Sequence, residues 1–312
     1  MRYGTGDFCY ELVEDWGIEA KLRWNVKEVA GIGISARDEV FLLTRVNPPI
    51  LVMDPQGHVQ SWFGSGIFVR PHGIHVDPDG SILAVDDGGH AVYCFDAQRT
   101  LVHTIGTPGA PSDTGCVNKD YRTILRAAGP FHYPTRLAKD SKGMIYITDG
   151  YGNARVHKFD PQYRLITSWG QPGTGPGCFQ LPHGIAIDSS DIVYVADRQN
   201  NRIQRFTTEG VFLDEWTGLD HPSDVWIDRG GTIYVSECKR TSCFDGAPSR
   251  ITIFNPNGTC LTQLSADPFY RLEQGYRCAH GLAIDSEGSL YITEVGKHLP
   301  DSFFGVKKYR RV

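Results

Sequence analysis

The chain has 312 residues, a formal net charge of −5 and a pI near 6.1. This acidic balance argues against binding to nucleic acid or to an anionic membrane surface, because both attract basic proteins. Hydrophobic residues make up 40% of the chain and charged residues 21%, as in an ordinary globular protein. The 35 glycines and 18 prolines are spread along the chain, which predicts many tight turns between short strands.

The N-terminal residues lack the apolar run of a signal peptide, and no segment approaches the roughly 20 apolar residues that span a bilayer. We therefore expect a cytoplasmic protein. The eight cysteines form no Cys-x-x-Cys pair. Without an export signal, free thiols are expected rather than disulfides. Cys238 and Cys243 are the closest pair in sequence and are weak evidence for a bond.

One sequence unit recurs six times. Each copy begins with an alternating apolar strand, continues through an Asp-x-x-Gly turn such as Asp77–Gly80, and enters a second strand rich in Ile, Val and Tyr. The spacing fits the ~40–45 residues of a four-stranded blade, with insertions. These units resemble NHL repeats over essentially the whole chain, which predicts an all-β, six-bladed β-propeller. The copies lie at 29–45, 71–87, 133–159, 181–206, 221–237 and 279–295.

The two ends of the chain explain how the ring would close. Val306–Tyr309 looks like a third strand without a fourth, and Tyr10–Gly17 looks like a fourth strand without its first three. Pairing the N-terminal strand with the C-terminal blade would remove two exposed edges. We therefore expect residues 1–312 to form a single propeller domain. The fourth strands end near tryptophans that are expected to wedge between neighbouring blades, namely Trp62, Trp169 and Trp216.

Alternate units carry a histidine at the start of the first strand: His72, His183 and His280. Alternate blades of a six-fold ring lie about 120° apart, so these imidazoles are expected to converge on the channel. Three neutral imidazoles with an open fourth position form a catalytic zinc arrangement. The alternative is that histidine packs against the next blade. The other units tolerate small residues in this slot, which favours the metal site: Ala30, Thr135 and Ser223.

Three further residues fall near the predicted channel mouth. Arg45 stands where the other units carry an acid, and it suits either a carboxylate ligand or a salt bridge to a neighbouring blade. Tyr151 follows a second strand, where its phenol would act as a base near a metal or pack on the rim. Arg198 is a rim cation that the sequence alone favours as structural. The insertion 107–131 is expected to form a rim loop.

A more specific resemblance rests on Arg45, Pro71-His72-Gly73, Asp149–Arg155, Leu181-Pro182-His183, Ala196-Asp197-Arg198 and Ala279-His280. Together these segments resemble the peptidyl-α-hydroxyglycine α-amidating lyase domain. The resemblance implies a zinc ion held by His72, His183 and His280, and cleavage of a peptidyl-α-hydroxyglycine into a peptide amide and glyoxylate. It further implies that Tyr151 removes the proton of the substrate hydroxyl, that Arg45 engages the carboxylate and that Arg198 lies close by.

The chain departs from the family pattern at several positions. The methionine two residues before the third histidine is Cys278. The acid directly after that histidine, associated with a structural calcium, is Gly281, which puts a structural Ca²⁺ in doubt. Cysteines that are paired in secreted members correspond to Gly152 and Tyr194, which fits a reducing compartment.

Three functions therefore stand open on the sequence. The first is a zinc-dependent lyase that acts on a small, carboxylate-bearing carbinolamide. The second is a metal-dependent hydrolase of a lactone or ester on the same propeller. The third is a non-catalytic NHL scaffold that binds a protein. The expected partner of either enzyme is a small molecule, with no nucleic acid and no membrane, and the sequence does not indicate the oligomeric state.

Overall fold

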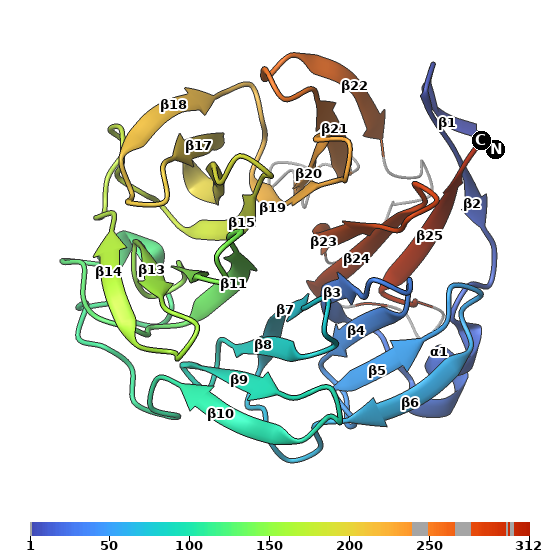
Figure 1. Cartoon of the computed structure of the whole chain (residues 1–312), viewed down its shortest axis with the longest axis horizontal. Helices are drawn as coiled ribbons and strands as arrows, with labels where there is room; N and C mark the ends of the chain where they lie inside the picture. Colours follow the sequence, from blue (N-terminus) through green and yellow to red (C-terminus); the bar gives the residue numbers. More distant parts are fainter. Residues whose placement is uncertain (1, 239–248, 266–275, 298, 300–302) are drawn as a thin grey trace.

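The computed structural model describes residues 2–238, 249–265, 276–297, 299 and 303–312, and these residues form six antiparallel β-sheets around a common axis (Figure 1). Each sheet is one blade, and the predicted six-bladed β-propeller is confirmed. The innermost strands are β3 (Val29–Ile34), β7 (Pro71–Val76), β11 (Pro134–Lys139), β15 (Pro182–Ile187), β19 (Pro222–Ile227) and β23 (Tyr276–Ile284).

Three further layers of strands surround the inner ring. The second strands are β4 (Val40–Thr44), β8 (Ile82–Asp86), β12 (Ile145–Asp149), β16 (Val193–Asp197), β20 (Ile233–Glu237) and β24 (Leu290–Lys297). The third strands are β5 (Ile50–Met53), β9 (Ala91–Phe95), β13 (Arg155–Phe159), β17 (Arg202–Phe206), β21 (Arg250–Phe254) and β25 (Val306–Arg311). The outer strands are β6 (Val59–Phe63), β10 (Leu101–Ile105), β14 (Leu165–Trp169), β18 (Phe212–Trp216), β22 (Cys260–Ser265) and β2 (Phe8–Val13).

The ring closes as the sequence predicts. β2 pairs antiparallel with β25, so that Tyr10 faces Arg311 and Val13 faces Lys308, and Figure 1 shows β2 beside β25. An additional strand, β1 (Arg2–Thr5), extends this sheet beyond β2. The expected strand Tyr10–Gly17 ends early, at Val13, because a turn leads into the short helix α1 (Ile18–Trp24).

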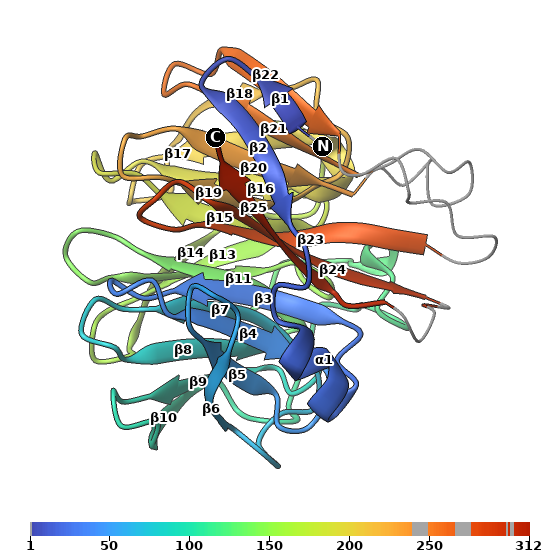
Figure 2. The same cartoon turned by 90° about the vertical axis from the view of Figure 1, so that its right-hand side faces the viewer.

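Helix α1 was not indicated by the repeat pattern. Figure 2 shows it beside the first blade, β3 to β6. In the part of the chain that the structure describes, no helix is long and apolar enough to cross a membrane.

A recurrent hydrogen bond reinforces the first hairpin of several blades. The turn aspartate accepts a bond from the hydroxyl of a buried tyrosine in the second strand, which ties the turn to the strand behind it. This pairing explains why the repeat carries both residue types. The pairs and their oxygen–oxygen distances are Tyr146–Asp140 at 2.9 Å, Tyr194–Asp188 at 3.0 Å, Tyr234–Asp228 at 3.2 Å and Tyr291–Asp285 at 3.1 Å.

The tryptophans divide into two kinds. Trp169 packs on Phe206 of the next blade with ring centroids 5.9 Å apart, and Trp216 packs on Phe254 at 5.2 Å, so both lie between blades as predicted. For Trp62 the prediction was wrong, because its side chain is 45% exposed and its ring contacts Trp24 of α1 instead. The neighbouring Phe63 makes the contact with the next blade instead, with its ring centroid 5.3 Å from that of Phe95.

Candidate metal centre

The three alternate histidines meet on the propeller axis. They come from β7, β15 and β23, and their ring centroids lie 4.9 Å (His72–His183), 4.6 Å (His72–His280) and 4.8 Å (His183–His280) apart. One nitrogen from each ring lies within 4.8 Å of the others, and all three side chains are buried. The predicted convergence is therefore confirmed geometrically.

Each imidazole is held by the blade that follows it in the ring. The Nδ1–H group donates to the main-chain carbonyl of the residue in the equivalent slot of that blade, which is one of the small or polar residues noted in the sequence. This bond fixes the tautomer and leaves the lone pair on Nε2. The bonds are His72 to Thr135 O at 2.7 Å, His183 to Ser223 O at 2.6 Å and His280 to Ala30 O at 2.7 Å.

The environment keeps all three rings neutral. Burial lowers the pKa of each histidine well below its ordinary value, and the neighbouring positive charges of Arg45 and Arg198 lower the pKa of His280 further. A neutral imidazole is the form that binds a metal. Among the described residues, His280 Nε2 is buried with no hydrogen-bond partner. A buried acceptor of this kind requires an explanation, and a metal ion satisfies it.

The donor set therefore fits a zinc ion with three protein ligands.

Tyr151, which the sequence predicts near this centre, lies beside the histidines. Its hydroxyl oxygen lies 3.1 Å from His72 Nε2 and 3.0 Å from His183 Nε2. Burial raises the pKa of the Tyr151 phenol, whereas the positive charges of Arg198 and Arg45 lower it. The phenol is thus a buried proton donor or acceptor whose state depends on the positive charge around it.

A close approach of two loops places Tyr151. A Cβ on Gly150 would lie 1.9 Å from the carbonyl oxygen of Pro182, so a side chain at that position would clash with the start of β15. Only glycine lets the segment after β12 pass this close to the neighbouring blade. The glycine before Tyr151 therefore helps to bring the phenol next to His183, which follows Pro182.

Arg45 forms an ion pair, but not with a neighbouring blade. Its Nη1 lies 2.9 Å from Glu28 Oε1, and Glu28 precedes β3 of the same blade. Arg45 Nε is buried without a hydrogen-bond partner within the described ranges. The arginine is thus anchored at one nitrogen and has a donor left for an anion. Its role as a carboxylate ligand stays a prediction.

Arg198 lies beside a disulfide that the sequence did not predict. Cys238 and Cys278 are bonded, which corrects the expectation of free thiols for this pair. Arg198 Nη2 lies 3.2 Å from Cys238 Sγ, and Arg198 Nε is a second buried nitrogen without a described partner. Cys243, the other half of the pair noted in the sequence, lies outside the described residues.

The fold explains this disulfide. The end of β20 and the start of β23 belong to adjacent blades, and their cysteine Cα atoms are 4.7 Å apart although 40 residues separate them in sequence. Sequence spacing cannot reveal such a contact. Disulfides persist in oxidising compartments, so the cytoplasmic location stays an untested prediction. The other cysteines in the described ranges are free: Cys9, Cys94, Cys116, Cys178 and Cys260.

Sequence reasoning missed three charged residues at this site. Lys119, from the insertion 107–131, places its Nζ 4.2 Å from the centroid of the Tyr151 ring and 2.8 Å from Asp87 Oδ2. Arg70 Nη1 binds the same Asp87 oxygen at 2.6 Å. Burial is the main cause that lowers the pKa of Lys119 to about 8. The insertion was expected on the rim, but no motif singled out the lysine.

The repeat and the fold define the class of protein. Residues 179–206 match the NHL repeat family. A Caenorhabditis elegans protein named "Probable peptidyl-alpha-hydroxyglycine alpha-amidating lyase pgal-1" is 31% identical over 259 residues, which cover 80% of this chain and 68% of that protein. The chain belongs to the peptidyl-α-hydroxyglycine α-amidating lyase family.

Two further comparisons show how far this relationship extends. The mouse "Peptidyl-glycine alpha-amidating monooxygenase" is 27% identical over 244 residues, which cover 66% of this chain and 24% of the mouse protein. This chain thus spans about a quarter of that relative's length. A Xanthomonas campestris gluconolactonase superposes with a TM-score of 0.59 and 15% identity, covering 91% of this chain and 86% of that one. At this identity the likeness shows the fold alone.

The disulfide gives a test of the site's architecture. Reduction should lower the free energy of unfolding by up to about 4 kcal/mol, the chain-entropy value for a loop of this length. Denaturant titrations with and without reductant measure the difference. The double variant Cys238→Ser/Cys278→Ser is the control and should not respond to reductant. Eight thiols in denatured, unreduced protein would contradict the bond.

Proposed function

We propose that this protein is a zinc-dependent lyase that cleaves the carbon–nitrogen bond of a small carbinolamide bearing a carboxylate. An N-acyl-α-hydroxyglycine, the class in the name of its nematode relative, is the best candidate. One observation carries the proposal: three buried Nε2 lone pairs meet within 4.8 Å of one another, and the Tyr151 hydroxyl lies at hydrogen-bond distance from two of them.

The three imidazoles would be the ligands of the ion. Three histidines leave a fourth position open for substrate, as catalytic zinc sites require. The bonds from Nδ1 to main-chain carbonyls orient the rings and increase their basicity. A zinc ion held there would act as a Lewis acid towards the carbinol oxygen and add positive charge beside Tyr151.

Tyr151 would transfer the proton of the substrate hydroxyl to the leaving nitrogen. When the carbinol becomes a carbonyl, the hydroxyl loses its proton and the C–N bond breaks with its electron pair on nitrogen. The leaving amide nitrogen then needs a proton, so the reaction neither consumes nor releases one overall. Tyr151 Oη can accept the hydroxyl proton as a base and return it to the nitrogen as an acid.

The surrounding cations would bind the carboxylate. Arg45 and Arg198 each have a buried Nε without a partner among the described residues. Lys119 adds a third positive charge next to Tyr151. In a site removed from water, such charges bind an anion strongly and orient it. Their arrangement favours a substrate that carries its negative charge close to the reacting carbon.

The metal content of purified protein tests the centre. We expect about one zinc per chain by elemental analysis, and we expect His183→Ala to lose it because two imidazoles bind zinc weakly. His75→Ala is the matched control, since His75 lies on the same strand as His72 but pairs with Asp77. Wild-type protein that binds no metal but captures a protein partner would instead favour a scaffold.

Tyr151→Phe tests the proton transfer. The variant should keep its zinc while turnover of an N-acyl-α-hydroxyglycine, measured as glyoxylate release, falls by about 10²–10⁴-fold. Tyr133→Phe is the control, because its ring also lies near Lys119, at 4.7 Å. Unchanged turnover in Tyr151→Phe would remove this residue from the mechanism. Lactone hydrolysis without glyoxylate release would favour the hydrolase.

The lowered pKa of Lys119 predicts that anion binding depends on pH. Its pKa is lowered to about 8, so the ammonium is charged below that pH and loses its charge as the pH rises through it. The affinity for a small carboxylate, measured by calorimetry, should therefore fall above about pH 8. In Lys119→Arg the guanidinium stays charged and this fall should disappear. An identical pH profile in both proteins would exclude Lys119 from the anion site.

A further inference from the structure

The residue directly after each channel histidine, or after its counterpart Ala30, Thr135 or Ser223, is the next feature of the inner strands. Four blades carry glycine there, and at three of these glycines the neighbouring inner strand approaches too closely for a side chain: Gly31, Gly73 and Gly184. A Cβ on Gly73 would lie 2.5 Å from Thr135 O, and one on Gly184 would lie 2.7 Å from the Cα of Asp224. The two exceptions are Arg136 in the third blade and Asp224 in the fifth.

These two exceptions bind each other across the axis. Arg136 Nη2 lies 3.1 Å from Asp224 Oδ2, and the side chains are only 9% and 2% exposed. Burial raises the pKa of Asp224, and the positive charge of Arg136 opposes that rise. A charge this deeply buried is stable only with a partner, so each residue depends on the other.

The pair also reaches three other blades. The Arg136 guanidinium donates to the carbonyl of Ile74 at 3.2 Å and to that of Ile32 at 3.3 Å. Asp224 Oδ2 accepts from the main-chain N–H of Leu282 at 3.3 Å. Through these contacts the pair joins the inner strands β3, β7, β11, β19 and β23.

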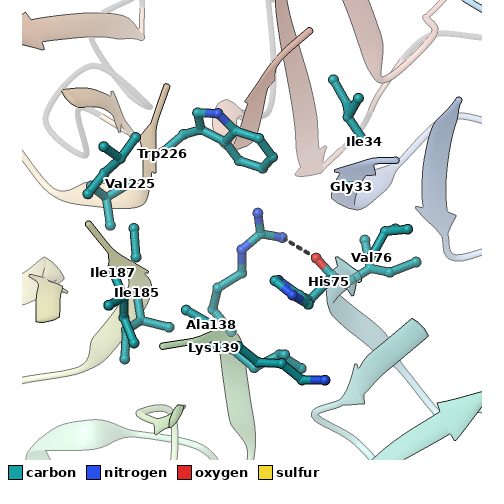
Figure 3. Close-up of a pocket in the computed structure, with 15 residues that line it drawn as sticks. Gly33, Ile34, His75, Val76, Ala138, Lys139, Ile185, Ile187, Val225 and Trp226 are labelled. Atoms are coloured by element: carbon teal, nitrogen blue, oxygen red, sulfur yellow. Dashed lines mark hydrogen bonds between the residues drawn. The ribbon is translucent and has the colours of Figure 1, made fainter. Parts of the chain in front are cut away.

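The ion pair lies directly beneath the histidines. A small cavity is lined by the three imidazoles together with Arg136 and Asp224. On the other side of the pair, a cavity of about 160 Å³ opens at the opposite mouth. Figure 3 shows this mouth lined by apolar side chains such as Ile34, Val76 and Trp226. The Arg136–Asp224 pair therefore separates the metal centre from the far end of the channel.

A calcium ion does not fit this place. Two main-chain carbonyls and a carboxylate are the oxygen ligands that Ca²⁺ prefers, but here the guanidinium of Arg136 occupies them. Gly281 supplies no acid, although a Cβ at that position would lie 3.5 Å from Asp224 Oδ2. A second cation beside the arginine would be repelled.

We propose that Arg136, paired with Asp224, is a built-in cation that takes the structural place of a channel metal ion and positions the zinc ligands. Arg136 directly follows Thr135, whose carbonyl holds His72, and Asp224 directly follows Ser223, whose carbonyl holds His183. Fixing these two residues therefore fixes the carbonyls that orient two of the three imidazoles. Arg136 is thus a positioning residue. The zinc part of this inference rests on the proposed function, and the calcium part does not.

The first arm of the test uses the unaltered protein. Adding CaCl₂ should leave the melting temperature of the wild-type chain unchanged, because the arginine already fills the oxygen cage. A rise in melting temperature with CaCl₂, matched by calcium binding in calorimetry, would overturn the proposal. This arm needs no variant and no activity, so it decides the calcium question even if the chain binds no zinc.

The second arm uses Arg136→Met, which removes the charge and keeps much of the volume. We expect the melting temperature to fall by at least about 5 °C, because Asp224 is left buried and unpaired. We expect added CaCl₂ to restore part of this loss in the variant alone. Zinc affinity should fall by about 10–100-fold, as for other residues that orient metal ligands.

Lys139→Met is the matched control. Lys139 lies on the same strand and forms an ion pair with Asp77, away from the histidines. This variant should keep the wild-type affinity for zinc, and its melting temperature should not respond to calcium. If Arg136→Met does not fold, Asp224→Asn, which keeps the shape of the carboxylate and one of its two acceptor oxygens, replaces it in the zinc measurement. Zinc affinity equal to wild type in whichever variant folds would overturn the positioning role.

Discussion

The candidate metal centre depends on one hydrogen bond repeated three times between neighbouring blades. In each case an imidazole Nδ1–H donates to the carbonyl of the equivalent residue in the next blade. The bond fixes the tautomer, directs Nε2 towards the axis and joins two inner strands. The histidines therefore supply the N–H donors, and the equivalent residues of the other three blades supply the carbonyl acceptors. The alternation around the ring supplies three donors and three acceptors, which is why three ligands rather than six meet at the centre.

On the side of the centre near Tyr151, the positively charged side chains outnumber the carboxylates that pair with them. Arg70 and Lys119 share the carboxylate of Asp87, and Arg45 is anchored by Glu28 through its Nη1. The side of the site near Tyr151 is therefore rich in positive charge, whereas the floor is closed by the neutral Arg136–Asp224 pair. Such a polarity favours an anion on one side of the ligands and excludes a second metal ion on the other. The proposed substrate site and the buried ion pair thus lie on opposite sides of the three imidazoles.

Several features were open to prediction from the sequence. Repeat spacing was sufficient for the blade count and for the closure of β2 on β25, because each blade is a local unit with its own turn residues. The histidine trio followed from symmetry. Lys119 and the disulfide were missed for the same reason: an irregular insertion and a contact between adjacent blades have no repeat position from which to argue. Trp62 was misplaced because the strand register puts Phe63, one residue later, in the position that Trp169 and Trp216 occupy in their blades.

The amino-acid sequence by itself determined the architecture and which three histidines converge on the axis, since periodic residues in a closed ring occupy equivalent places. Only the tertiary structure decided which groups face those side chains: Tyr151 at hydrogen-bond distance, the Cys238–Cys278 bond beside Arg198, and Arg136 across the axis from Asp224. These contacts join residues of different blades, and their geometry is set by how closely the blades pack around the axis. Local sequence patterns carry no information on such distances.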